Sequence, residues 1–216
     1  MIGIVDWRVS RCEALGVQLR CNVFADAQAV LADSPDIVII ATGGLPNTEL
    51  LETGNELVTP SWDILSGDAK IGADVLLFDD NGGYPGMQAA EVIALAGSKL
   101  EVVSPERFFA PEMGGMNHVP YAQVFQQHAV VTTINRRLVA VQREGAKLAA
   151  IIGSDFGPWR ETRLVDQVVV EHGTIPVADL YFALEPLSRN LGEVDFRAFV
   201  AGAPQRVERN PDGRFT

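Results

Sequence analysis

The chain has 216 residues, a formal net charge of −11 and a sequence pI near 4.7. This acidic balance argues against a nucleic-acid partner, because recognition of nucleic acid generally needs a basic face. With 47% hydrophobic residues, the chain can bury one large core or two small ones. Its two cysteines lack Cys-x-x-Cys spacing and its three histidines form no His-x-x-x-His pair. We therefore predict neither a disulfide framework nor a metal site.

The sequence also lacks the pattern of a membrane or secretory segment. No stretch reaches the roughly 20 apolar residues that are needed to span a bilayer. Near the N-terminus, Asp6, Arg8 and Arg11 interrupt any apolar region of a signal peptide. We therefore expect a cytoplasmic protein with no membrane partner.

The first 41 residues alternate expected helices and strands. Apolar residues at three- and four-residue spacing predict a helix over 2–15, and Asp26 is placed to cap a second helix over 27–32. A short strand is expected over 17–21, and the unbroken β-branched run 36–41 is typical of a strand covered on both faces. A doubly wound unit would place one more strand before these elements. The chain is therefore expected to begin inside a domain.

The segment that follows is rich in turn-forming residues. Thr42-Gly43-Gly44-Leu45-Pro46 allows either a tight turn or a close approach of the backbone to a ligand. Residues 47–70 are polar, and within them Thr59-Pro60-Ser61-Trp62-Asp63 is expected to cross between two domains.

Residues 71–104 predict a strand–turn–helix–strand unit, which is the setting of a dinucleotide-binding fingerprint. The strands are expected at 74–78 and 100–104. The helix between them begins near Pro85 and stops at Gly97.

The fingerprint itself is altered. In Gly-x-Gly-x-x-Gly register, the three glycine positions fall on Asp79, Asn81 and Tyr84. Glycines do occur nearby, but they are out of register, at Gly82, Gly83 and Gly86. A pyrophosphate would meet the carboxylates of Asp79 and Asp80 before any helix N-terminus. The turn is therefore either a modified phosphate loop or a tight turn that does not bind NAD(P). Ser104 stands where a ribose-binding acid is expected, which leaves the choice of NAD or NADP open.

The remaining residues predict a helix over 120–128, a strand over 130–134 and a last core strand over 168–170. Between them lies a β-meander, with a turn at Glu144-Gly145 and strands at 138–142, 148–152 and 160–164. The expected fold is α/β, with a parallel or mixed sheet and the meander covering one side.

The run Asp36-Ile-Val-Ile-Ile-Ala-Thr-Gly-Gly-Leu-Pro46 resembles the Ala-Thr-Gly segment of flavoproteins that have two dinucleotide-binding domains. From Ile2 to about Val194, the layout is similar to the C-terminal region of the trimethylamine dehydrogenase and 2,4-dienoyl-CoA reductase family. The resemblance implies an FMN barrel of the old yellow enzyme type, then a 4Fe-4S cluster segment. It also implies two Rossmann-like nucleotide-binding domains, the second inserted into the first.

The chain departs from this family in what it lacks. The first βαβ unit with the glycine-rich FAD/ADP loop, the cysteine cluster and the barrel are all missing. We therefore expect an excised piece with two domains. Residues 1–65, joined by 191–216, would form a partial FAD/ADP-binding-type domain, and residues 66–190 would form an inserted NAD(P)-binding-like domain.

The resemblance implies cofactor-binding residues in two places. The first set, for FAD or ADP, is Thr42, Gly43, Gly44 and Pro46. The second set, for NAD(P), is Gly82, Gly83 and Gly86. FMN and the 4Fe-4S cluster would belong to the parent enzyme only, and the alternative is that this piece binds no cofactor. We predict no catalytic acid, base or nucleophile and no metal ligand.

Two functions follow as alternatives. The first is the nucleotide-binding region of a flavin-dependent NAD(P)H:flavin oxidoreductase or amine dehydrogenase. It would be inactive alone and partnered by the missing FMN barrel of the same polypeptide. The second is a degenerate structural domain that docks an electron carrier, such as an electron-transferring flavoprotein. The altered glycine register favours the second function for the inserted domain.

Overall fold

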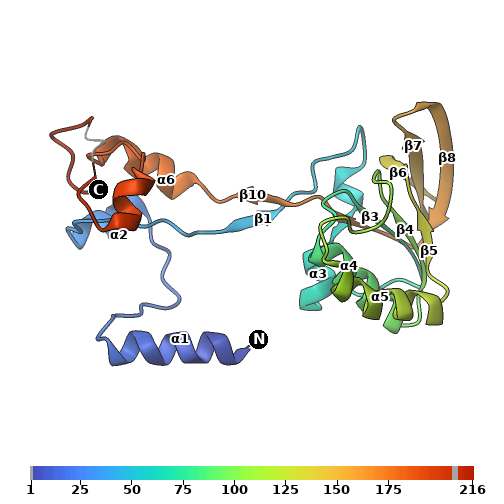
Figure 1. The fold of residues 1–216 in the computed structure, drawn as a ribbon. Helices are drawn as coiled ribbons and strands as arrows, with labels where there is room; N and C mark the ends of the chain where they lie inside the picture. Colours follow the sequence, from blue (N-terminus) through green and yellow to red (C-terminus); the bar gives the residue numbers. More distant parts are fainter. Residues whose placement is uncertain (1, 206–208) are drawn as a thin grey trace. The chain divides into compact units, whose positions relative to one another are not determined.

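The computed structural model describes residues 2–205 and 209–216, so residues 206–208 of the expected returning tail lie outside the description. The chain divides into two compact units (Figure 1). One unit is continuous, Gly43–Pro176, and the other combines Met1–Thr42 with Val177–Thr216. The breaks therefore fall at 42/43 and 176/177, whereas the sequence placed them near 65 and 190.

A five-stranded parallel sheet forms the centre of the Gly43–Pro176 unit (Figure 1). Its strand order is β2-β9-β3-β4-β5, and every neighbouring pair is parallel. The bounds are Thr59–Pro60 for β2, Asp74–Asp79 for β3, Lys99–Val103 for β4, Val131–Thr133 for β5 and Gln167–Glu171 for β9. The third strand takes the central place because its apolar run suits burial on both faces.

The two faces of β3 pack against different layers, since side chains alternate along a strand. Val75 and Leu77 share a core with three helices, which are α3 (Ser61–Ser66), α4 (Tyr84–Leu95) and α5 (Gly115–Gln127). Leu76 and Phe78 share a second core with an antiparallel three-stranded sheet, β6 (Arg137–Glu144), β7 (Lys147–Ser154) and β8 (Gly157–Val165). The expected βαβ unit, β-meander and α/β fold class are confirmed.

A two-stranded ribbon and a short turn complete this unit. The ribbon pairs β1 (Gly44–Pro46) with β10 (Thr174–Pro176) in antiparallel fashion. The 3-10 turn η1 (Asn55–Leu57) is held by the Asn55 side chain. Its Oδ1 accepts hydrogen bonds from the backbone N–H groups of Leu50 (3.2 Å) and Leu51 (2.9 Å).

The second unit is mainly helical. Its elements are α1 (Ile2–Ala14), α2 (Ala27–Ala32), α6 (Asp179–Leu184), η2 (Glu185–Leu187) and α7 (Phe196–Ala201). Asp26 caps α2 as predicted, and its Oδ1 accepts from the Ala29 N–H at 2.8 Å. In the described part of the chain, no helix is both long and apolar enough to cross a membrane.

Two expected strands of this unit do not form. Residues 17–21 and 36–41 have no regular strand structure. Ile37 and Ile39 are 67% and 81% exposed, so the run is not covered on both faces. Its backbone bonds are made to the tail, where Thr216 accepts from Val38 N–H and donates to the Asp36 carbonyl, both at 2.9 Å. A parallel strand needs a neighbour along its whole length, and the described residues supply one at a single position.

Two boundaries also differ from the sequence expectation. Residues 59–63 do not cross between domains, because Thr59 and Pro60 pair with Val169 and Val170 at the sheet edge and α3 follows directly. The helix expected over 120–128 begins at Gly115 and carries Pro120 within its first two turns.

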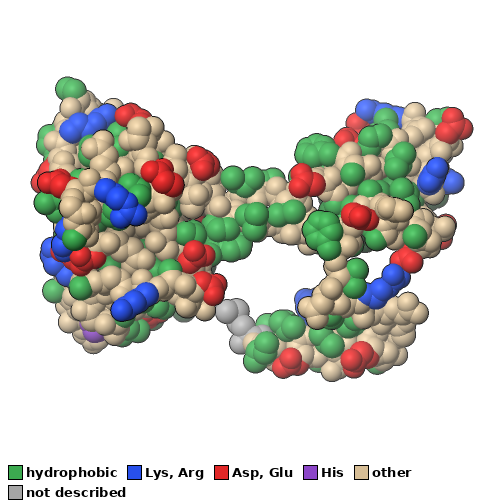
Figure 2. Space-filling view, turned by 180° about the vertical axis from the view of Figure 1, so that it is seen from behind, with side chains coloured by type: hydrophobic (Ala, Val, Ile, Leu, Met, Phe, Trp, Pro, Cys, Tyr) green, Lys and Arg blue, Asp and Glu red, His purple; other side chains and the backbone are tan. Residues whose placement is uncertain are grey.

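On the face drawn in Figure 2, Lys and Arg side chains are scattered rather than gathered into one patch.

Candidate nucleotide site at the ends of β3 and β9

The topology of the central sheet points to one place for a ligand. From β3 the chain moves outward to β4 and β5 on one side, whereas β9 and β2 lie on the other side. Ligands of open parallel sheets bind at this switch of direction, beyond the carboxyl ends of the strands. Here the two strand ends carry Asp79 and Glu171, which are directly paired in the sheet register.

The side chain of Asp79 lies inside the turn between β3 and α4 and is bound by the turn's backbone amides. Its side chain is completely buried, and its Oδ1 accepts hydrogen bonds from the backbone N–H groups of Asn81 (3.0 Å) and Gly82 (2.9 Å). In dinucleotide-binding domains, the backbone amides of the corresponding turn hold the phosphates of the ligand. The protein's own carboxylate therefore stands in the role of the bound anion. The other oxygen, Oδ2, has no hydrogen-bond partner among the described residues.

Gly86 lets α4 approach β3 closely. A Cβ atom on Gly86 would lie 2.2 Å from Asp79 Oδ2, far inside van der Waals contact. This is the packing role that the third glycine of a fingerprint normally has. Tyr84, which occupies the third position in register, instead accepts a hydrogen bond on Oη from Asn117 Nδ2 at 2.5 Å.

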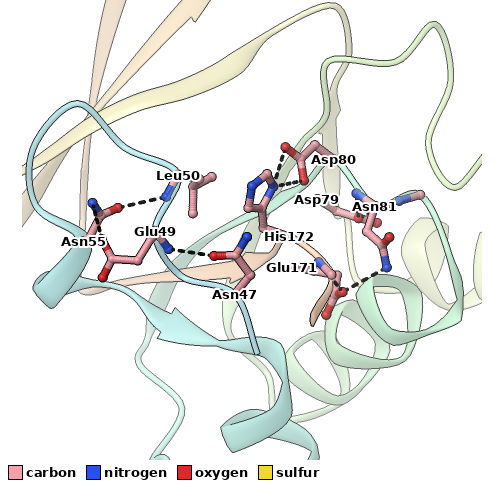
Figure 3. A network of polar contacts seen from close by, with 11 residues as sticks. Asn47, Glu49, Leu50, Asn55, Asp79, Asp80, Asn81, Glu171 and His172 are labelled. Atoms are coloured by element: carbon pink, nitrogen blue, oxygen red, sulfur yellow. Dashed lines mark hydrogen bonds and ion pairs between the residues drawn. The ribbon is translucent and has the colours of Figure 1, made fainter. Parts of the chain in front are cut away.

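Glu171 is the centre of a second set of contacts (Figure 3). It is only 3% exposed, and its Oε1 accepts from Asn81 Nδ2 (3.0 Å) and from the Gly173 N–H (3.2 Å). Ser61 Oγ, at the start of α3, donates to Oε2. These donors are neutral, and among the described residues neither Asp79 nor Glu171 forms an ion pair with a Lys, Arg or His side chain.

Asp80 and His172 form a pair at the rim of the same site (Figure 3). His172 Nδ1 lies 2.7 Å from Asp80 Oδ1 and 2.8 Å from Oδ2. Both side chains are partly exposed. The carboxylate fixes the orientation of the imidazole ring and leaves Nε2 facing away from this contact.

The electrostatics of the site favour a protonated Asp79. Burial, which removes the carboxylate from water, raises the pKa of Asp79 to about 7. This value already includes the negative charges of Glu171 and Asp80, which also raise the pKa, and the N–H groups of Gly82 and Asn81, which lower it. Asp79 is therefore only partly ionised at neutral pH.

The segment after β4 covers the outer side of the turn. The Glu112 N–H donates to the Gly82 carbonyl at 3.1 Å. A Cβ atom on Gly82 would lie 2.8 Å from Pro111 Cδ, so Pro111 sits directly on this glycine. In a dinucleotide-binding domain the ligand passes between this turn and the end of the second strand. In this chain Pro111 and Glu112 contact Gly82 on that turn.

The expected site residues fall into two places. Gly82 and Gly83 lie on the turn between β3 and α4, and Gly86 lies in the first turn of α4. Gly44 and Pro46 lie in the β1–β10 ribbon, where a Cβ atom on Gly44 would be 2.8 Å from the Ile175 carbonyl oxygen. Thr42 Oγ1 donates to the Val177 carbonyl at 2.6 Å, and Gly43 has a φ of +70°. A cofactor-binding role for these seven residues stays a prediction.

The sequence did not single out Ser61, Glu171 or His172. The sequence does contain a pattern that indicates them. Glu171-His172-Gly173 stands at the end of an apolar strand, as Asp79-Asp80-Asn81 does. Parallel strands bring their carboxyl ends to one edge, so both polar groups could have been placed together. In the described part of the chain, no three His, Cys, Asp or Glu side chains are arranged to hold a metal ion.

No protein-family model matches the chain, but curated relatives do. It is 54% identical over 215 residues to a probable N-methylproline demethylase of Rhizobium meliloti (strain 1021), covering 100% of this chain and 32% of the relative. It is 38% identical over 211 residues to the N,N-dimethylglycine/sarcosine dehydrogenase of Chromohalobacter salexigens, covering 94% and 30%. The chain thus spans about a third of the length of the curated relatives it matches.

Among solved structures, a 2-naphthoyl-CoA reductase in complex with 2-naphthoyl-CoA aligns with a TM-score of 0.67 and 25% identity, over 81% of this chain and 26% of that chain. The fold is that of the dinucleotide-binding class, and the turn after β3 is occupied by the chain's own Asp79 carboxylate. The chain belongs to the trimethylamine dehydrogenase and 2,4-dienoyl-CoA reductase family.

Proposed function

We propose that this chain is the nucleotide-binding region of a flavin-dependent oxidoreductase that acts on N-methylated amines. The names of the two curated relatives support this substrate class, since both describe chemistry on N-methyl amino acids. FMN and an iron–sulfur cluster would be held by residues outside this chain, because its two cysteines cannot supply the four thiolates of a 4Fe-4S centre. The FMN barrel would then be the principal partner of this region.

We also propose that the Gly43–Pro176 unit binds NAD(P)H weakly. The single observation that carries this proposal is the acceptance by Asp79 Oδ1 of hydrogen bonds from both turn amides, those of Asn81 and Gly82. A dinucleotide would have to displace an internal carboxylate that is already in place, and Pro111 restricts its path. The residues present therefore do not fit the usual mode of dinucleotide binding.

Calorimetric titration of the chain with NADH, NADPH and ADP at pH 8 tests this proposal. We expect NADH and NADPH to bind with a Kd of about 0.1 mM or weaker, corresponding to roughly 5.5 kcal/mol or less. Low-micromolar binding of either would refute weak binding. ADP shows whether the adenosine diphosphate half binds by itself, since it lacks the nicotinamide half. A matching rise in melting temperature would confirm that any bound ligand prefers the folded state.

The substrate class is tested on the full-length protein. Oxidation of an N-methyl group gives an iminium that water converts to formaldehyde and the demethylated amine. We expect formaldehyde release from N-methylproline, N,N-dimethylglycine or sarcosine in the presence of an artificial electron acceptor. Absence of turnover with all three, together with NADH-dependent reduction of an activated alkene, would contradict the proposal.

A docking role for an electron carrier is the second candidate. It is favoured by the same closed turn, because a unit without a tightly bound dinucleotide can still present a surface to a partner. The acidic balance of the chain suits a partner with a basic face. Salt-dependent co-purification of the full-length protein with such a carrier would support it.

A further inference from the structure

The turn between β3 and α4 retains the parts of an anion site even though Asp79 occupies it. Its amides point at a carboxylate, and α4 begins at Tyr84, after its N-cap residue Gly83, which has no side chain to cap the helix. The helix has 12 residues, so its N-terminus carries a positive dipole end. Asp79 is the group that accepts the turn amides, and its Oδ2 is buried with no hydrogen-bond partner among the described residues.

We propose that this turn is a latent site for the diphosphate of a nucleotide, and that protonation of Asp79 opens it. The inference rests on the proposed function, because it assumes that the turn is closed to NAD(P)H at pH 8. Ionised Asp79 is a strong acceptor for the Asn81 and Gly82 amides, whereas the neutral carboxyl group is a weak one. When the Asp79 carboxyl group is neutral, the two amides and the helix N-terminus are available to bind an external anion.

The surroundings explain why Asp79 would take up the proton. From β9, Glu171 faces it in register, and from the turn Asp80 adds a second negative charge. His172 is bound to Asp80 and not to Asp79. From α4 the nearest residue is Gly86, and from the segment after β4 Glu112 contributes its backbone N–H to Gly82. No Lys or Arg of the described residues acts on Asp79 as a counter-ion.

The proton balance of the site is simple. Above the pKa of Asp79, binding of one diphosphate takes one proton from solvent, and the carboxylate becomes a carboxyl group. Nothing is oxidised or reduced. Nucleotide affinity should therefore rise about tenfold for each pH unit below 8.5 until Asp79 is fully protonated, and then level off.

The test uses NAD⁺, whose own charge does not change between pH 5.5 and 8.5. Calorimetric titrations at pH 5.5, 6.5, 7.5 and 8.5 compare the unmodified chain with Asp79→Asn and His172→Gln. In the unmodified chain we expect the Kd to fall at least tenfold from pH 8.5 to 5.5. Asp79→Asn, which mimics the neutral carboxyl group, should bind at all four pH values with a Kd constant within about twofold.

The His172 variant is the matched control, since an imidazolium near the turn would also favour anions in acid. We expect His172→Gln to keep the full pH dependence. The proposal is overturned if this variant loses the dependence while Asp79→Asn retains it. It is also overturned if neither the unmodified chain at pH 5.5 nor Asp79→Asn at pH 8.5 binds NAD⁺.

A second measurement does not depend on any variant. Titration of the unmodified chain at pH 8 in two buffers of different ionisation enthalpy counts the protons taken up, and we expect about one per NAD⁺ bound. An uptake of zero contradicts the gating. Tight NADH binding at pH 8 would instead refute the proposed function, so the two failures can be told apart.

Discussion

At the scale of single residues, Asp79 replaces a glycine that a dinucleotide-binding turn would carry and supplies a charge that such a turn would receive from its ligand. This replacement makes the free energy of unfolding depend on pH. The folded chain holds the pKa of Asp79 near 7, against an ordinary value of 3.8, so the folded state binds this proton more tightly than the unfolded state. Stability from this group is therefore fully present below about pH 4 and is lost as pH rises through 7.

Asp79→Asn should remove this pH dependence. A shift of about three pKa units corresponds to at most about 4 kcal/mol between pH 4 and pH 7. We expect the free energy of unfolding of the unmodified chain to fall by about 2–4 kcal/mol more than that of the variant across this range. Urea unfolding at pH 4.5, 6 and 7.5 measures the difference. Parallel pH profiles for the two chains would show that Asp79 keeps its ordinary pKa.

At the scale of elements, α4 and β3 are joined through Gly86. Gly86→Ala gains helix propensity of about 1 kcal/mol but must move Asp79 or the helix to place a Cβ at 2.2 Å from Oδ2. We expect a net destabilisation of about 1–3 kcal/mol. Gly115→Ala is the matched control, because it lies at the start of α5 with nothing within 4 Å of its Cβ position.

The cost of Gly86→Ala should shrink in a chain that also carries Asp79→Ala. Removing the carboxylate removes the atom with which the new methyl group collides. A double-mutant cycle by chemical denaturation measures this coupling, which we expect to exceed about 0.5 kcal/mol. Additive effects would mean that Gly86 acts on something other than Asp79.

The elements that were predictable are those whose signals are local. The apolar run of β3, Pro85 in the first turn of α4 and the Glu144-Gly145 turn each specify their structure within a few residues. The run 36–41 has an equally strong local signal but forms no strand, because pairing depends on a neighbour that the described residues do not provide. The site was half predictable: the altered glycine register located Asp79, whereas Glu171 and His172 join it only through the pairing of β3 with β9.

At the scale of the whole molecule, the chain combines a complete sheet unit with a unit of short helices. Unit Gly43–Pro176 has two cores, one on each face of its sheet. The other unit buries few large apolar side chains, which include Leu184 and Phe215. The segment Thr42–Pro46, for which the family implies a flavin or ADP contact, spans the junction in sequence between the two units.

We expect the isolated chain to purify without flavin colour. In related domains FAD is held by a glycine-rich turn between a strand and a helix N-terminus, and in the described part of this chain the turn of this kind between β3 and α4 is occupied by Asp79. Absorption spectra after gentle purification, with the full-length protein as the positive control, measure this. Stoichiometric flavin absorbance in the isolated chain would show that other residues suffice to hold FAD.

The most direct measurement of the central claim, that Asp79 occupies its own phosphate turn, is an NMR titration of the folded chain from pH 5 to pH 9. It follows the Asp79 carboxyl carbon and the backbone amides of Asn81 and Gly82. We predict that all three titrate together with a midpoint near 7, because one carboxyl group accepts both amide bonds. An Asp79 carboxyl carbon that shows almost no titration between pH 5 and pH 9, as the ordinary pKa of 3.8 requires, would contradict the account, and so would amides of Asn81 and Gly82 that do not follow it.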